Sequence, residues 1–170
     1  MADLDADQAA SLASIFRPGD PAGVGKVSPN AVVTRNGGRF GAAHRAAPTQ
    51  PDPALWPAAD FDVLVQTFKA HGFRPSCAWY LNDDANIAYT RRAPNGGRLS
   101  QPMLFVNGDF DQICTITGNR QGDPMREACA DLTLTSMPSG HWLPLERKAE
   151  LIQAIRSWLL SKNLMATART

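Results

Sequence analysis

Pro102–Asp111, PMLFVNGDFD, is a short apolar run that ends in acidic residues. Such a run predicts a strand buried in a parallel sheet, with polar side chains at its carboxyl end. A second run, Leu132–Trp142 (LTLTSMPSGHW), predicts another strand. The segment between them, Asp123–Ala130 (DPMREACA), predicts a short helix.

The segment after the second strand, Glu146–Leu160 (ERKAELIQAIRSWLL), predicts an amphipathic helix with Leu151, Ile155, Trp158 and Leu159 facing inward. Strand, helix, strand, helix indicates an α/β fold with a parallel sheet and right-handed crossovers. Two parallel strands do not form a stable sheet by themselves, so we expect this chain to hold the end of a larger sheet.

Asp111 follows the first predicted strand, and His141 follows the second. Because parallel strands end at the same edge of a sheet, both side chains are expected at the edge where α/β sheets bind ligands. A carboxylate there can accept the imidazole Nδ1–H and leave Nε2 as a general base. Asp109 lies two residues before Asp111 and can face the same side. The alternative is a loop aspartate and a histidine that only closes a strand end.

The N-terminal half has a different character. Asp3–Arg17 predicts a helix that stops at Pro18-Gly19, and Gly19–Pro57 is rich in glycine, proline and alanine, with a short extended piece expected at Ala31–Thr34. Asp60 is expected to cap a helix that ends at Gly72.

The segment Cys77–Arg92 is a further helical candidate, and it carries the aromatic pair Trp79 and Tyr80. Aromatic pairs on a helix commonly serve only to pack. The chain therefore divides into residues 1–92, mainly helical with a long loop, and residues 93–170, with the strands.

Composition limits the function. The net charge of +1 gives no electrostatic reason to expect nucleic acid or an anionic membrane as a partner, and no apolar run is long enough to span a bilayer. The acidic first ten residues do not have the pattern of a signal peptide. Cys77, Cys114 and Cys129 have neither disulfide nor metal-site spacing, so we expect free thiols, a cytoplasmic protein, no metal and no cofactor.

Four segments together resemble the C-terminal half of the soluble epoxide hydrolases of the α/β-hydrolase fold. In order along the chain they are SLASIFR from Ser11, LVQTFKAHGFRPSCAWYLN from Leu64, PMLFVNGDFD and SGHW. The resemblance runs from about residue 12 to 160. GFRPSCAWYLN is its most specific part, whereas SGHW before a helix is common across the fold.

The resemblance implies roles for individual residues. His141 matches the histidine that activates water, and Asp111 matches the acid that orients it. Asp109 matches an auxiliary acid, and Trp142 would form a wall of the pocket. Tyr80, beside Trp79, matches a tyrosine of the helical lid that hydrogen-bonds the epoxide oxygen.

Residues 1–92 would then be the lid (cap) region, and residues 93–170 the C-terminal part of the hydrolase core. Tyr80 favours an epoxide over a halide, for which a Trp or Asn donor would be expected in related dehalogenases.

The sequence also departs from this family. It contains neither the aspartate nucleophile on its elbow nor the His-Gly-x-Pro turn that helps to bind the oxyanion. The resemblance therefore implies a truncated α/β-hydrolase fold that is inactive alone on an organic epoxide. Activity would require an N-terminal half or a homologous hydrolase chain as a partner.

Two alternatives remain. One is a non-catalytic binding module that holds an apolar ligand or a partner hydrolase. The other is a partial gene product without a stable fold.

Overall fold

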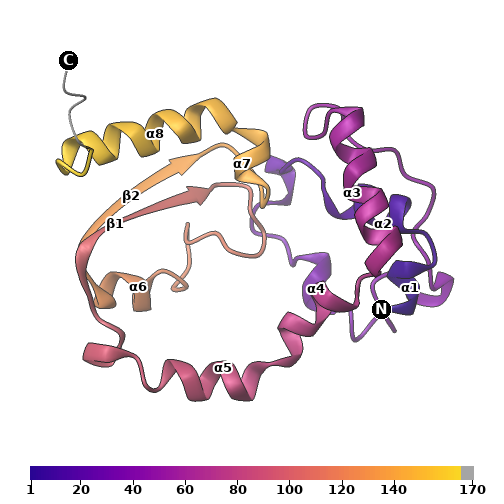
Figure 1. Cartoon of the computed structure of the whole chain (residues 1–170), viewed down its shortest axis with the longest axis horizontal. Helices are drawn as coiled ribbons and strands as arrows, with labels where there is room; N and C mark the ends of the chain where they lie inside the picture. Colours follow the sequence, from indigo (N-terminus) through magenta and orange to yellow (C-terminus); the bar gives the residue numbers. More distant parts are fainter. Residues whose placement is uncertain (166–170) are drawn as a thin grey trace. The chain divides into compact units, whose positions relative to one another are not determined.

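The computed structural model describes residues 1–165, and the chain divides into two compact units. The N-terminal unit comprises Met1–Pro18 and Gly25–Arg92. The C-terminal unit comprises Gly19–Val24 and the chain from Ala93 onward. Figure 1 labels the helices and strands of both units, which are described separately below.

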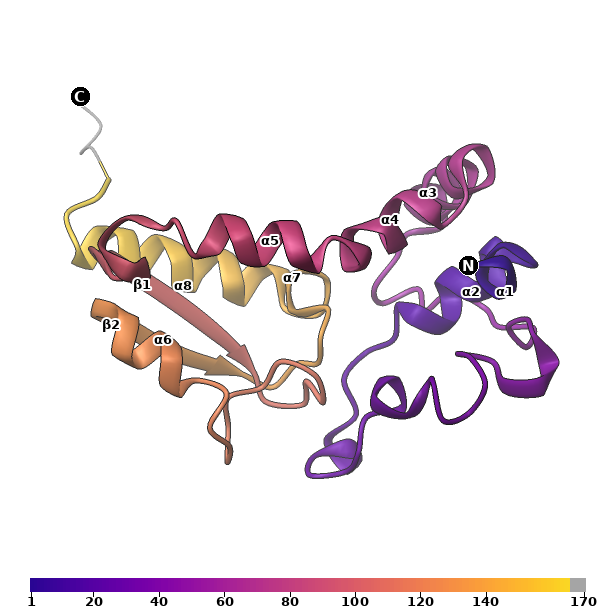
Figure 2. The same cartoon turned by 90° about the horizontal axis from the view of Figure 1, so that it is seen from below.

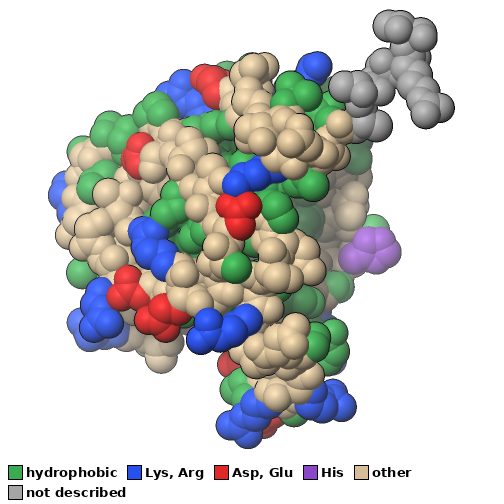
Figure 3. Space-filling view, turned by 90° about the vertical axis from the view of Figure 1, so that its left-hand side faces the viewer, with side chains coloured by type: hydrophobic (Ala, Val, Ile, Leu, Met, Phe, Trp, Pro, Cys, Tyr) green, Lys and Arg blue, Asp and Glu red, His purple; other side chains and the backbone are tan. Residues whose placement is uncertain are grey.

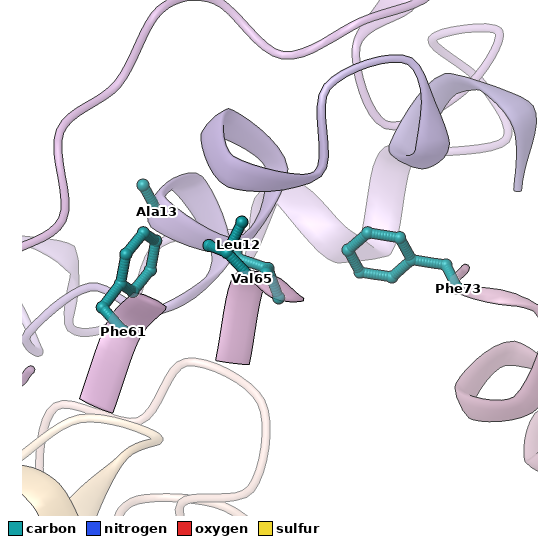
Figure 4. Close-up of a cluster of buried hydrophobic side chains, with 5 residues drawn as sticks. All are labelled: Leu12, Ala13, Phe61, Val65 and Phe73. Atoms are coloured by element: carbon teal, nitrogen blue, oxygen red, sulfur yellow. The ribbon is translucent and has the colours of Figure 1, made fainter. Parts of the chain in front are cut away.

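The N-terminal unit is helical. Its α-helices are α1 (Ala2–Asp5), α2 (Gln8–Ile15), α3 (Ala58–His71), α4 (Arg74–Ala78) and α5 (Asp83–Thr90), and η2 (Pro29–Val32), η3 (Gly41–Ala43) and η4 (Trp79–Leu81) are short 3-10 helices. Its buried core joins Leu12 and Ala13 of α2 to Phe61 and Val65 of α3, with Phe73 beyond (Figure 4). Because α3 presents Phe61 and Val65 four residues apart, both lie on the face turned to α2.

Four local predictions for this unit are corrected. The helix expected at Asp3–Arg17 is two helices, because the Asp7 side chain accepts a hydrogen bond from Ala10 N at 3.0 Å and caps α2. The extended piece expected at Ala31–Thr34 is wrong. A 3-10 helix lies at Pro29–Val32, where Ser28 caps it and Pro29 presets its first turn.

The third correction concerns α3, which begins at Ala58 after Pro57, so that Asp60 lies in its first turn and does not cap it. Gly72 ends α3 as predicted, with a left-handed φ of 66° that glycine adopts readily. The fourth correction concerns the single helix predicted for Cys77–Arg92, which is divided among α4, η4 and α5. Phe73 N donates to Asp5 Oδ1 at 2.9 Å and ties the start of α4 to α1.

The C-terminal unit contains the predicted parallel sheet. β1 (Leu99–Gly108) and β2 (Cys129–Met137) pair in parallel, with Phe105 opposite Leu134 and Gly108 opposite Met137. Each strand begins three residues before its predicted start, and α6 (Asp123–Ala128) connects them. The helices α7 (Leu143–Glu146) and α8 (Lys148–Ser161) follow, and the 3-10 helices η1 (Pro21–Gly23) and η5 (Pro94–Gly97) complete the unit. α6 and α8 lie on opposite sides of the sheet (Figures 1 and 2).

The helix α8 is held to the sheet partly by polar contacts. Trp158 Nε1 donates to Thr133 Oγ1 at 3.2 Å, and Lys162 Nζ pairs with Asp131. Of the four side chains expected inward, Leu151, Trp158 and Leu159 are half-buried, whereas Ile155 is exposed. The amphipathic helix is therefore present, but its apolar face is only partly covered.

The C-terminal unit buries little apolar surface. Among its described residues, Met137 and Leu143 are the buried hydrophobic side chains. Leu99, Leu134, Ile152 and Leu160 are exposed, and the space-filling view shows hydrophobic side chains among charged ones on the face near the strand beginnings (Figure 3). A two-stranded sheet covers too little area to bury these groups.

Within residues 1–165, no helix has the length and apolar character needed to cross a bilayer.

Candidate active site

The structure brings Asp111 and His141 together at the carboxyl ends of β1 and β2. His141 Nδ1 lies 3.0 Å from Asp111 Oδ2. The Asp111 side chain is only 10% exposed, whereas that of His141 is 42% exposed. The carboxylate is therefore largely buried, and the imidazole ring retains access to solvent. The predicted spatial relationship between these two residues is confirmed, while their catalytic role stays a prediction.

The loop after β1 holds Asp111 in place. Asp111 Oδ1 accepts hydrogen bonds from the backbone N–H groups of Ile113 at 2.8 Å and Cys114 at 3.1 Å. This Asx-type turn occupies one carboxylate oxygen and leaves the other for the imidazole. The orientation of Asp111 is thus set by its own loop, independently of His141.

The loop that carries His141 is held by close backbone packing. A Cβ on Gly108 would lie 2.7 Å from the carbonyl oxygen of Gly140, so the strand ends approach closely only because this residue is glycine. Phe110 N donates to Ser139 O at 2.9 Å, which extends the pairing beyond the sheet. The two loops therefore leave the sheet side by side.

Glu146 fixes the other side of this loop. Its Oε2 accepts from Gly19 N at 2.9 Å and from Gly140 N at 3.0 Å. Two backbone donors from segments far apart in sequence thereby share one carboxylate. The role of Glu146 could not be predicted from the sequence, because no pattern near Glu146 indicates that Gly19 lies beside it.

Asp109 does not share the position of Asp111. Its Oδ1 accepts from Asn107 Nδ2 at 3.1 Å, and Asn107 is almost fully buried. Asn107 also accepts from Ile116 N at 2.9 Å and donates to Thr117 Oγ1 at 3.0 Å. Asn107, a second residue that sequence reasoning missed, ties the loop after β1 to its strand. A buried amide at a strand end, ahead of a polar loop, is the signal that could have pointed to it.

The aromatic candidates lie in different places. Trp142 packs edge-on against His141, with ring centroids 5.1 Å apart. Trp79 and Tyr80 belong to η4 of the N-terminal unit, and Tyr80 is 78% exposed. Packing alone does not account for Trp79 and Tyr80, since both side chains are exposed.

Cys114 is a third side chain beside the Asp111–His141 pair. Its Sγ, a carboxylate oxygen of Asp111 and a ring nitrogen of His141 all lie within 4.8 Å of one another. The Cys114 side chain is exposed overall, but partial desolvation of the thiol, and next the negative charge of Asp111, raise its pKa above the ordinary value. Cys77, Cys114 and Cys129 are free, as predicted.

A cavity of about 370 Å³ lies near the carboxyl end of the sheet. Its lining includes Asn107, Thr117, Arg126 and Leu134. Neither Asp111 nor His141 lines it, so this cavity gives no access to the pair.

The arrangement of Asp111 and His141 suits proton transfer. With the Nδ1 proton directed at Asp111, the lone pair of His141 lies on Nε2, where it can accept a proton from water. The chemistry available to the pair is therefore that of a general base with its orienting acid.

Comparison with known proteins gives related sequences. No protein-family model matches the chain. The chain is 31% identical over 123 residues to Epoxide hydrolase A of Mycobacterium tuberculosis, a match that covers 67% of this chain and 36% of that protein. It is 23% identical over 160 residues to Bifunctional epoxide hydrolase 2 of Rattus norvegicus, which covers 93% of this chain and 27% of that protein. The chain spans well under half the length of these two relatives, and it is related in sequence to epoxide hydrolases.

Proposed function

We propose that this chain carries the acid–base part of an epoxide-hydrolase-type active site. The observation that supports this most directly is the 3.0 Å contact between His141 Nδ1 and a shielded Asp111 carboxylate at the carboxyl edge of a parallel sheet. The relationship to epoxide hydrolases is independent support. His141 is the base, and Asp111 orients it and stabilises the imidazolium that forms.

In the proposed reaction an organic epoxide is hydrolysed to a diol. A carboxylate first opens the epoxide and forms an ester with one carbon of the substrate. His141 Nε2 then takes a proton from water, and the resulting hydroxide attacks the carbonyl carbon of the ester. The ester C–O bond breaks, the carboxylate is regenerated, and the imidazolium of His141 returns its proton so that a neutral diol leaves. Tyr80 donates a hydrogen bond to the epoxide oxygen as the ring opens, in keeping with its resemblance to the lid tyrosine.

The carboxylate nucleophile comes, in this proposal, from another polypeptide segment. The C-terminal unit would be the last part of a truncated α/β-hydrolase core, and residues 1–92 would belong to the lid. The exposed apolar side chains of β1, β2 and α8 and the two-stranded sheet support this view, because further strands would cover them. The proposed partner is an N-terminal half or a homologous hydrolase chain.

The experiment combines this chain with the part of Epoxide hydrolase A that lies outside the matched region. Diol formation from an aryl epoxide such as styrene oxide should require both components and should be lost with His141→Gln. His71→Gln is the matched control, since His71 ends α3 and is exposed. Turnover that survives His141→Gln, or a complex of the two components without turnover, would contradict the proposal.

A second candidate is a non-catalytic module that binds an apolar ligand or a partner hydrolase. The exposed Trp79, Tyr80, Leu81 and Tyr89 favour it, because together they leave a large apolar area without cover. This candidate predicts a complex with full-length Epoxide hydrolase A that Trp79→Ser weakens and His141→Gln leaves intact.

A further inference from the structure

We infer that Asp111, Cys114 and His141 form a binding site for a zinc-like divalent cation. Their potential ligand atoms, one oxygen, one sulfur and one nitrogen, lie within 4.8 Å of one another. This inference goes beyond the proposed hydrolase chemistry and does not depend on it.

The distances suit a small tetrahedral ion. Zinc bonds of about 2.0–2.1 Å to nitrogen and oxygen and about 2.3 Å to sulfur place the ligand atoms of one ion about 3.3–3.6 Å apart. The separation of 3.0 Å between His141 Nδ1 and Asp111 Oδ2 is already close to this value. The thiol has to move inward by about 1 Å, and a rotation of the exposed Cys114 side chain supplies such a shift.

The backbone supports this ligand set. The N–H of Cys114 donates to Asp111 Oδ1 at 3.1 Å, so that one short turn carries two of the three ligands. The third comes from the loop after β2, which Glu146 holds through Gly140 N. Two ligands thus come from one ordered loop and one from another, so little rearrangement is needed on binding.

The ligand types select the ion. Magnesium and calcium prefer oxygen ligands alone, whereas one thiolate, one imidazole and one carboxylate suit zinc or a softer ion such as cadmium. A thiolate and a carboxylate together neutralise the charge of a divalent ion. Since Cys114 and His141 are exposed, the ion can enter from solvent, and a fourth position stays open for water.

The sequence did not predict this site, because its cysteines lack metal-site spacing and its ligands come from two separate loops. A bound ion would take the lone pair of a His141 ring nitrogen and would fix the ring beside Asp111. The ion would therefore compete with any base function of His141.

The test uses the full chain without an affinity tag, titrated with zinc in a calorimeter and with cobalt in a spectrophotometer. We expect one zinc ion per chain and a sulfur-to-cobalt charge-transfer band. Cys114→Ser should abolish this band and weaken zinc binding at least about tenfold, since it removes one of three ligands. His141→Gln and Asp111→Asn should each weaken zinc binding as well.

Cys129→Ser and His71→Gln are the matched controls, and both should bind zinc like the unaltered chain. Circular dichroism checks that each variant keeps its helices; Cys114→Ser changes one exposed atom and leaves no cavity. The inference is wrong if zinc does not bind, if Cys114→Ser binds zinc as tightly as the unaltered chain, or if Cys129→Ser removes the cobalt band.

Discussion

Gly19 and Gly140 lie with their backbones in contact, and this contact borders the turn that carries His141. A Cβ built on Gly19 would lie 2.3 Å from Gly140 N and 2.5 Å from its Cα. The same two residues donate their N–H groups to Glu146. The position of the histidine loop therefore depends on a segment at the other end of the chain.

Replacing Gly19 by alanine should displace this loop. The added methyl group overlaps backbone atoms, which cannot rotate away, so we expect a loss of about 1–3 kcal/mol in the free energy of unfolding. The NMR signals of the His141 ring should also shift. Gly118→Ala is the control. A Cβ there meets nothing within 4 Å, so the only cost of alanine is its φ of 70°. Equal ring shifts in both variants would contradict the role of the Gly19 contact.

Replacing Glu146 by glutamine should weaken the same junction. The glutamine side chain has one acceptor oxygen in place of two and carries no charge, so its hydrogen bonds to Gly19 and Gly140 should be weaker. We expect the free energy of unfolding, measured by urea titration, to fall by about 1–3 kcal/mol. Glu150→Gln serves for comparison, since Glu150 forms only an exposed pair with Arg147 at 3.4 Å. The prediction fails if the two variants unfold at the same urea concentration.

Replacing Asn107 by alanine should loosen the loop after β1. The change leaves Ile116 N–H without its partner and removes the amide that Asp109 and Thr117 contact, which we expect to cost about 1–3 kcal/mol. Hydrogen exchange at Ile116 should accelerate. Asn119→Ala should change stability much less. The Asn119 side chain donates to Thr115 O and Thr117 O and accepts from Gln121 N, and all three hydrogen bonds are exposed and lie within one loop.

The thiol of Cys114 should respond to the charge of Asp111. Burial and this carboxylate raise the thiol pKa, so the thiolate is scarcer than in an ordinary cysteine at the same pH. Asp111→Asn removes the negative charge and should lower the pKa, which speeds alkylation by iodoacetamide at a fixed pH just above neutral. Alkylation is followed at Cys114 by peptide mass spectrometry.

Asp109→Asn is the matched control for this measurement, because it removes a carboxylate two residues away that bonds Asn107. It should leave the alkylation rate of Cys114 nearly unchanged. A slower reaction in Asp111→Asn would show that the carboxylate does not act on the thiol through its charge.

Replacing Leu12 by alanine should destabilise the N-terminal unit. Leu12 is 1% exposed and packs in the cluster with Phe61 and Val65, so the cavity should cost about 2–5 kcal/mol. Leu81→Ala, at a side chain that is 77% exposed, should change stability by well under 1 kcal/mol. The measurement is the loss of helical circular dichroism on heating, and similar losses in both variants would contradict the assigned core.

Local patterns in the sequence were sufficient to predict the two parallel strands, the amphipathic helix after them and the end of α3 at Gly72. Apolar runs, helical periodicity and a glycine after the last periodic residue of a helix involve only a few neighbouring residues, so they can be recognised without knowledge of the fold. The approach of Asp111 to His141 was also predictable, because parallel strands end at a common edge. Local patterns misled at Asp7, where a cap interrupts the helical periodicity, and at Ser28, where a capped 3-10 helix replaces the expected extended piece.

The surroundings of the Asp111–His141 pair depend on contacts between segments that are distant in the sequence. The contact of Gly19 with Gly140, the shared acceptor Glu146, the amide network of Asn107 and the position of Cys114 join segments that the sequence separates. Such contacts depend on which surfaces meet when the chain closes on itself, and no local propensity encodes that. Local sequence patterns therefore specify the two strands and the polar residues at their ends, while the packing of distant backbone segments specifies which groups lie beside the histidine.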